Sequence, residues 1–188
     1  MDLQSVLKTY KDFPKQGITF FDIIPYLQDK EIYRTLIDRI AECTTAPNVA
    51  APEARGFLFT APLLIVSRCV HNIIPVRKSG KLPFAEGDLH EVKIVKEYGF
   101  DKLYYRTSDI AAGLPTGDVI EISIIDDVLA TGGTAEGVAE SLQSLVVERG
   151  GKQYPVRIKE FVFIVELEEL GGAARLEKIA PVKSIVKL

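Results

Sequence analysis

The chain has 188 residues, enough for one domain with a sizeable core, and 47% of them are hydrophobic, as is ordinary for a globular protein. Its net charge of −3 argues against a nucleic-acid partner, and no run nears the ~18 apolar residues that span a bilayer. We therefore expect a single cytoplasmic domain over residues 1–188 with no membrane partner. Cys43 and Cys69 match no metal spacing and no disulfide framework, so we expect two buried thiols.

The first part of the chain predicts a helix, a turn, a strand and a second helix. Leu3–Tyr10 has a short helical pattern, which a turn containing proline and glycine ends. Ile18–Ile24, which includes Phe20 and Phe21, indicates a strand. Taken alone, such rings are more often core residues than ligand contacts. An apolar stripe then predicts a helix over Glu31–Cys43.

An arginine follows the next predicted strand in a position that suits anion binding. Asn48–Ala51 indicates a short strand, and Leu58–Cys69 indicates an apolar helix. Arg55 and Gly56 lie between them. A guanidinium at a strand end, beside a glycine and a helix start, can hold a phosphate through two N–H groups, although a surface ion pair is the alternative.

More cations follow the strand predicted over Ile73–Arg77. Arg77, Lys78 and Lys81 are three cations within five residues. Such a cluster is usually only solvated, but in an acidic chain with an anionic ligand a cluster at a strand end favours a phosphate clamp. The segment from Phe84 to Lys96 is polar and irregular, and long loops of this kind in enzymes are often lids. A strand over Lys102–Arg106 follows it.

The most informative stretch is residues 119–138. A strand rich in β-branched residues is followed by Asp126 and Asp127, then by the Thr/Gly loop Thr131–Thr134 and a helix over Ala135–Glu148. At the carboxyl edge of a parallel sheet, the glycines let the backbone approach an anion, and the helix N-terminus carries a partial positive charge. The two acids would repel that anion, so they suit ribose hydroxyls or a magnesium ion. These features alone leave open an ordinary glycine-rich turn.

Strands over Arg157–Val165 and Ser184–Leu188 complete the pattern. We expect an α/β fold whose central, mostly parallel sheet carries helices on both faces. A strand buried on both faces should be almost wholly apolar, yet the strand before Asp126 carries Glu121 and Ser123. We expect these two side chains to form a locally satisfied polar face.

The string from the central strand through the Thr/Gly loop resembles the signature of type I phosphoribosyltransferases, which bind 5-phosphoribosyl 1-pyrophosphate (PRPP). In that family the two acids hold the ribose hydroxyls and the loop holds the 5′-phosphate. The resemblance implies the family's fold, with a small hood from about residues 1–30 and a mobile loop over about residues 82–100. It also implies Mg²⁺, held mainly through PRPP, with Asp126 and Asp127 as candidate protein ligands. The implied PRPP contacts are Asp126, Asp127, Ala130, Thr131, Gly132, Gly133 and Thr134.

Four further segments resemble the adenine phosphoribosyltransferases within that family, in the family's order. Together they extend from Asp12 to Lys178, nearly the whole chain. The chain departs from the family pattern at Phe21, Thr60, Phe84 and Lys96. The four segments are Asp12–Pro25, Glu53–Phe59, Arg77–Pro83 and Glu168–Lys178.

The same resemblance implies a role for individual residues. The purine stacks between Phe20 and Val128, and the backbone of Thr19 and Phe21 reads its edge. Arg55 and Glu97 are the implied catalytic residues, with Glu97 on the mobile loop exchanging a proton with the purine. The implied pyrophosphate contacts are Glu53, Ala54, Arg55, Arg77, Lys78, Lys81 and Tyr98.

The expected reaction is the purine-salvage transfer of a phosphoribosyl group from PRPP to adenine, giving AMP and pyrophosphate. We expect a homodimer in which one subunit lends cations to the other. Two alternatives remain open. One is a phosphoribosyltransferase for hypoxanthine, guanine or xanthine, because backbone groups that select the purine edge are not visible in sequence. The other is a PRPP-binding regulatory protein.

Overall fold

The computed structural model describes residues 2–17, 19–95 and 100–188. Its main sheet has the strand order β10-β9-β7-β3-β4-β6-β5, with β8 paired to β9. The first five strands of this order are parallel, whereas β6, β5 and β8 pair in the antiparallel sense. The mostly parallel sheet is therefore confirmed. The strands are β3 (Asn48–Pro52), β4 (Asn72–Lys78), β5 (Leu89–Val95), β6 (Phe100–Arg106), β7 (Ile120–Leu129), β8 (Val146–Arg149), β9 (Lys152–Glu166) and β10 (Val182–Lys187).

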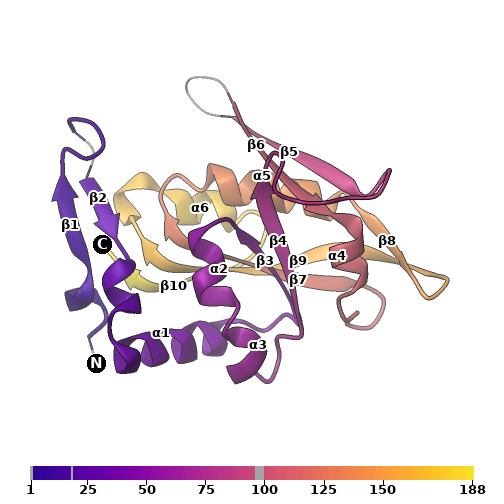
Figure 1. The fold of residues 1–188 in the computed structure, drawn as a ribbon, viewed down its shortest axis with the longest axis horizontal. Coiled ribbons are helices and arrows are strands. Elements are labelled where there is room, and N and C mark those ends of the chain that lie inside the picture. The colour runs from indigo at the N-terminus through magenta and orange to yellow at the C-terminus, as the bar shows by residue number, and fades with distance from the viewer. Residues whose placement is uncertain (1, 18, 96–99) are drawn as a thin grey trace.

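Helices cover both faces of the sheet, as expected (Figure 1). One core layer joins the sheet to α1 (Lys30–Cys43), α2 (Arg55–Thr60) and α3 (Leu63–Val66). The opposite layer includes α4 (Thr107–Ala111), α5 (Gly133–Gln143) and α6 (Gly172–Leu176). The described residues also form three short 3₁₀ helices: η1 (Gln4–Val6), η2 (Ile24–Leu27) and η3 (Glu168–Leu170).

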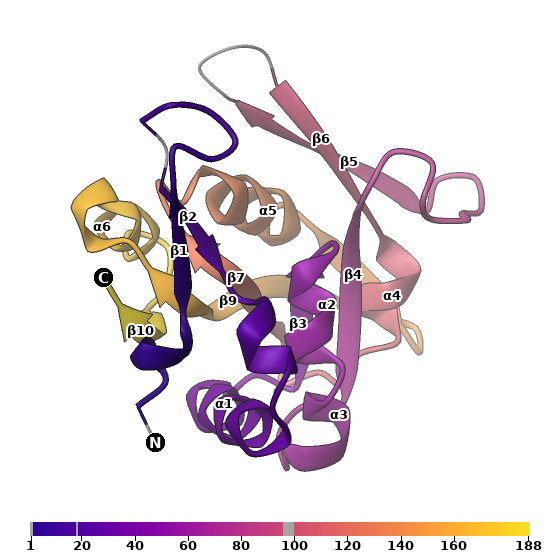
Figure 2. The same cartoon turned by 60° about the vertical axis from the view of Figure 1, so that its left-hand side comes forward.

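A separate two-stranded hairpin stands at one end of the molecule (Figures 1 and 2). It consists of β1 (Lys8–Lys11) and β2 (Thr19–Asp22), with Tyr10 paired to Phe20. The helix predicted over Leu3–Tyr10 is therefore wrong beyond its first turn. Pairing with β2, a partner outside the local sequence, overrides the helical pattern of these residues.

Three other predicted elements are interrupted or replaced. The helix predicted over Leu58–Cys69 splits into α2 and α3, because Pro62 cannot donate a helical hydrogen bond. The helix predicted to end at Glu148 stops at Gln143, and β8 follows it. The segment predicted to be irregular contains β5, whose buried Val92 and Ile94 alternate with polar neighbours as in an ordinary strand.

The polar side chains Glu121 and Ser123 of β7 both have partners on neighbouring segments. Ser123 donates to the buried carboxylate of Glu160 on β9. That carboxylate also accepts hydrogen bonds from the backbone and hydroxyl of Thr45 and from Lys183. Burial alone would raise the pKa of Glu160, but these hydrogen bonds outweigh it and lower the pKa below its usual value. Glu121 is paired to Lys159 at 3.0 Å, so the expected local satisfaction is confirmed.

The thiols are less buried than predicted. Cys43 and Cys69 are free and only partly covered, and the Cys69 thiol donates to the carbonyl of Thr45. Partial burial raises the pKa of both thiols. Within the described ranges, no helix is both long enough and apolar enough to cross a bilayer.

Candidate active site at the carboxyl edge of the sheet

Two neighbouring parallel strands deliver the predicted polar residues to one edge of the sheet. β7 carries Asp126 and Asp127 near its carboxyl end, and its neighbour β3 runs directly into Glu53 and Arg55. Because carboxyl ends of parallel strands meet at the same edge, these residues converge. They line a cavity of about 180 Å³ together with Pro52, Lys78, Ile94, Asp101, Leu103 and Thr134.

A second cavity, of about 110 Å³, adjoins the first and is formed by the Thr/Gly loop. Gly132 caps α5 with φ +78°, a conformation that favours glycine. The loop is backed by α6: a Cβ at Gly172 would overlap the carbonyl oxygen of Ala130. The first residues of α5 line this cavity, and the backbone N–H groups at a helix start have no partners within the helix, as an anion site requires. Its lining is Asp126, Val128–Ala135 and Phe163.

The two acids carry negative charge that the protein offsets only in part. The backbone N–H of Asp127 donates to Asp126 at 2.9 Å. Burial and the neighbouring Asp127 carboxylate raise the pKa of Asp126 well above its usual range. Nε of Arg55 lies 2.7 Å from Oδ2 of Asp127, yet this buried oxygen has no hydrogen bond of normal geometry in the described part of the chain. The short distance makes the contact an ion pair, and its poor alignment leaves the oxygen able to accept another ligand.

The donor set fits a magnesium ion that is shared with a substrate. In the described residues, no cluster of three or more His, Cys, Asp or Glu side chains could hold a metal alone. Mg²⁺ is commonly bound by one or two carboxylates, with substrate phosphates and waters completing its shell. Asp126 and Asp127 supply two carboxylates, and Oδ2 of Asp127 has no hydrogen-bond partner among the described residues, so the pair matches that requirement.

The cation cluster lies beside Glu53. Nε of Arg77 is 2.6 Å from the Glu53 carboxylate, and the same guanidinium donates to the carbonyl of Lys81. Burial would raise the pKa of Glu53, but its hydrogen bond from Arg77 and the nearby positive charges lower it. Lys78 lines the 180 Å³ cavity, whereas the Lys81 side chain is exposed on the following turn. Arg77 is thus held by Glu53, and Lys78 is the member of the cluster that shares a cavity lining with Asp126 and Asp127.

The hairpin brings an aromatic ring to the same edge. The Arg55 guanidinium lies 5.9 Å from the centroid of the Phe20 ring, and Phe13 packs edge-on against that ring at 5.2 Å. Thr19 and Phe21 flank Phe20 on β2, and half-buried Val128 lines the loop cavity. Ala54 caps α2. Glu97 and Tyr98 lie outside the described residues.

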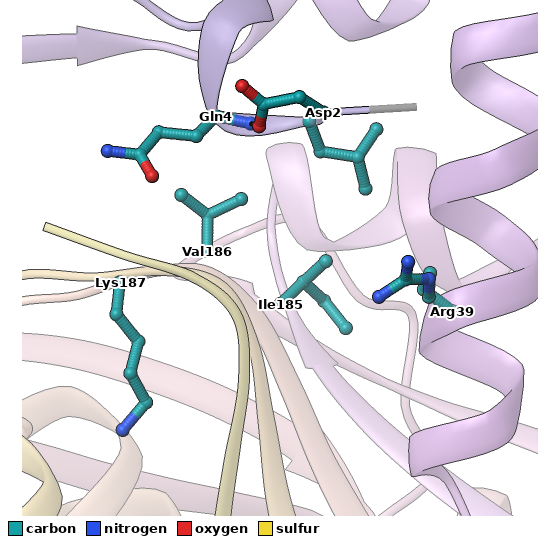
Figure 3. Close-up of a pocket in the computed structure, with 7 residues that line it drawn as sticks. Asp2, Gln4, Arg39, Ile185, Val186 and Lys187 are labelled. Atoms are coloured by element: carbon teal, nitrogen blue, oxygen red, sulfur yellow. Dashed lines mark hydrogen bonds between the residues drawn. The ribbon is translucent and has the colours of Figure 1, made fainter.

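A larger cavity, of about 370 Å³, lies elsewhere, between the N-terminal segment, α1 and β10 (Figure 3). Asp2, Arg39 and Lys187 are among its lining residues, and the Asp2 carboxylate is turned toward Gln4, whose backbone N–H donates to it at 3.0 Å. Lys187 is already paired with Glu166 at 3.3 Å. The lining of this 370 Å³ cavity includes no predicted site residue, so the size of a cavity alone does not identify the site.

Relatives of known identity span almost the whole chain. An adenine phosphoribosyltransferase from Clostridium acetobutylicum is 39% identical over 179 residues, which cover 94% of this chain and 92% of the relative. The chain belongs to the adenine phosphoribosyltransferase family. The crystal structure of the adenine phosphoribosyltransferase from Thermoanaerobacter pseudethanolicus superposes with a TM-score of 0.80 at 33% identity, covering 99% of this chain and 98% of that one. The Saccharomyces cerevisiae adenine phosphoribosyltransferase, solved with an imino-altritol bisphosphate and adenine, gives 0.77 at 29% identity, covering 97% and 96%. No family model matches the sequence.

Membership of the adenine phosphoribosyltransferase family makes the chain a transferase of purine salvage with the type I fold. The sequence did not predict the side of the candidate site that β5 and β6 form. Ile94 of β5 and Asp101 and Leu103 of β6 line the acid cavity. The period-two alternation in residues 89–95 is a signal for β5, but only the long-range pairing of β6 with β4 reveals where that hairpin lies.

Proposed function

We propose that this protein transfers the phosphoribosyl group of PRPP to adenine, forming AMP and pyrophosphate. The observation that carries the proposal is the meeting of Arg55, the Asp126–Asp127 pair and Thr134 in one cavity at the sheet edge. In this proposal the two acids hold the ribose hydroxyls, the Thr/Gly loop holds the 5′-phosphate and Arg55 holds the pyrophosphate. The adenine in the 29% identical yeast relative supports this choice of base.

The proposed mechanism relies on charge and position. As the bond between the anomeric carbon and pyrophosphate lengthens, the sugar becomes oxocarbenium-like and the leaving group gains negative charge. Arg55 and Lys78 stabilise that charge, helped by Arg77 and Lys81, while Asp126, Asp127 and the Thr/Gly loop hold the sugar phosphate still. When bound, Mg²⁺ supplies further positive charge to the pyrophosphate.

The purine must be held in line with the sugar and must lose a proton as it becomes a nucleotide. In the proposed arrangement Phe20 and Val128 enclose the ring, and the backbone of Thr19 and Phe21 reads its edge. Glu97 takes the proton, a role suited to a carboxylate that a closing loop screens from water. Glu53, Ala54 and Tyr98 complete the proposed pyrophosphate site.

A substrate panel tests this function. The purified protein is incubated with PRPP, Mg²⁺ and each of adenine, hypoxanthine, guanine and xanthine, and nucleotide and pyrophosphate release are measured. We expect turnover with adenine and its loss after chelation of Mg²⁺. Preference for an oxopurine would favour the alternative enzyme, and PRPP binding without turnover of any base would favour a regulatory protein.

We also propose a homodimer in which the Arg77–Lys81 segment of one subunit approaches the other subunit's site. Support comes from an exposed apolar surface on α2 and α3, where Ile65 is 87% exposed and Leu58, Leu64 and Val66 are each more than two-fifths exposed. Light scattering should give about twice the 20.8 kDa of one chain. Ile65→Asp should shift the protein toward monomer, and a fully active parent of monomer mass would contradict the proposal.

A further inference from the structure

The phosphate loop has a neighbour to which the proposed mechanism gives no role. Helix α6 packs against α5 and the Thr/Gly loop, and it carries Arg175 in its last turn. Nη1 of Arg175 lies 3.7 Å from the position that a Cβ would occupy on Gly133. A guanidinium is thus fixed beside the backbone that would receive the 5′-phosphate.

The partner of Arg175 explains why a cation is needed there. Glu136 lies in the first turn of α5, the helix whose N-terminus faces the loop cavity. A carboxylate at this position suits the helix dipole of the free protein, but it repels any anion that binds at the same terminus. Nε and Nη2 of Arg175 lie 2.6 and 2.5 Å from Oε2 of Glu136. Both contacts converge on one carboxylate oxygen and leave Nη1 next to Gly133.

We propose that Arg175 is a positioning residue for phosphate binding: it neutralises Glu136 at the N-terminus of α5, so that the Thr/Gly loop can accept the 5′-phosphate of PRPP and AMP. This inference rests on the proposed function. Arg175 acts through Glu136 and need not touch the phosphate. The ion pair is partly exposed, at 46% for Arg175 and 24% for Glu136, so its effect should weaken as salt concentration rises.

The test compares Arg175→Gln with the parent protein, using AMP and adenosine as calorimetric probes. Leaving Glu136 uncompensated near a phosphate should weaken AMP binding about tenfold at low salt. Adenosine, which lacks the phosphate, should bind as it does to the parent. The KM for PRPP should rise while the KM for adenine and kcat change little. Lys152→Gln removes another exposed pair, with Asp118, and serves as the matched control.

The double variant Arg175→Gln/Glu136→Gln separates neutralisation from direct contact. If Arg175 acts through Glu136, removing both charges should restore AMP affinity to within about threefold of the parent. A double variant as weak as Arg175→Gln would overturn the proposal, as would parental AMP binding by the single variant. Equal weakening of AMP and adenosine binding would show a merely structural role and would also overturn the proposal.

Arg175→Lys, which keeps the charge, should bind AMP nearly as the parent does, and it controls for misfolding of the glutamine variant. A parent protein that binds neither AMP nor PRPP would instead refute the proposed function.

Discussion

Arg55→Gln is expected to lower kcat/KM for PRPP about 10²- to 10³-fold, the range found when one preorganised donor to a developing charge is removed. Arg55 is the cation that contacts both Asp127 and the Phe20 ring. Initial-rate kinetics with varied PRPP measure the effect. Arg55→Lys keeps the charge but loses the planar fork, so it should recover only part of the activity.

The matched control for this variant is Arg157→Gln. Arg157 is an exposed arginine near the start of β9, about 20 Å along the strand from Phe163, which is paired with Asp126. The control should retain parental kinetics. If Arg55→Gln stays within about threefold of the parent, the pyrophosphate assignment of Arg55 fails.

The same variant should change the pH dependence in a defined direction. Arg55 favours the charged form of Asp126, although burial and Asp127 dominate and raise the pKa of Asp126. Removing the guanidinium raises this pKa further, so a higher pH is needed to ionise the carboxyl group. The acidic limb of the kcat/KM profile should therefore move to higher pH in Arg55→Gln.

Glu97→Gln is expected to lower kcat with adenine about 10²- to 10⁴-fold, as is typical of losing a general acid or base. Glutamine keeps the size of the side chain but cannot take a proton. PRPP affinity, measured by calorimetry, should change little, because Arg55 and the phosphate loop are untouched.

Glu86→Gln is the matched control for Glu97. Glu86 is an exposed glutamate in the same expected loop segment, and its substitution should leave turnover unchanged. Parental turnover by Glu97→Gln would refute the proton role. Loss of PRPP binding would make Glu97 a structural residue of the loop instead.

The sequence predicted best those features that one short segment encodes. Residues 119–138 contain their own strand, turn glycines and helix start, so local chemistry was enough to expect an anion loop beside two acids. The hairpin partner of Tyr10 and the hydrogen-bond donors to Glu160 come from distant segments, and no local pattern reveals them. The same limit applies to the Arg55–Asp127 pair: each residue was recognised separately, but their contact depends on the adjacency of β3 and β7.

The contact between Arg55 and Asp127 links the two halves of the proposed PRPP site. In the free protein Arg55 and Asp127 are each other's counter-ion, 2.7 Å apart. Under the proposed roles, free pyrophosphate would bind Arg55 and leave the buried Asp127 carboxylate without a counter-ion. A sugar phosphate without pyrophosphate would bind Asp127 and leave Arg55 without one. PRPP carries both replacement partners on one molecule. Under these proposed roles the site would favour the intact donor over either fragment, and the two residues would pair again once both products have left.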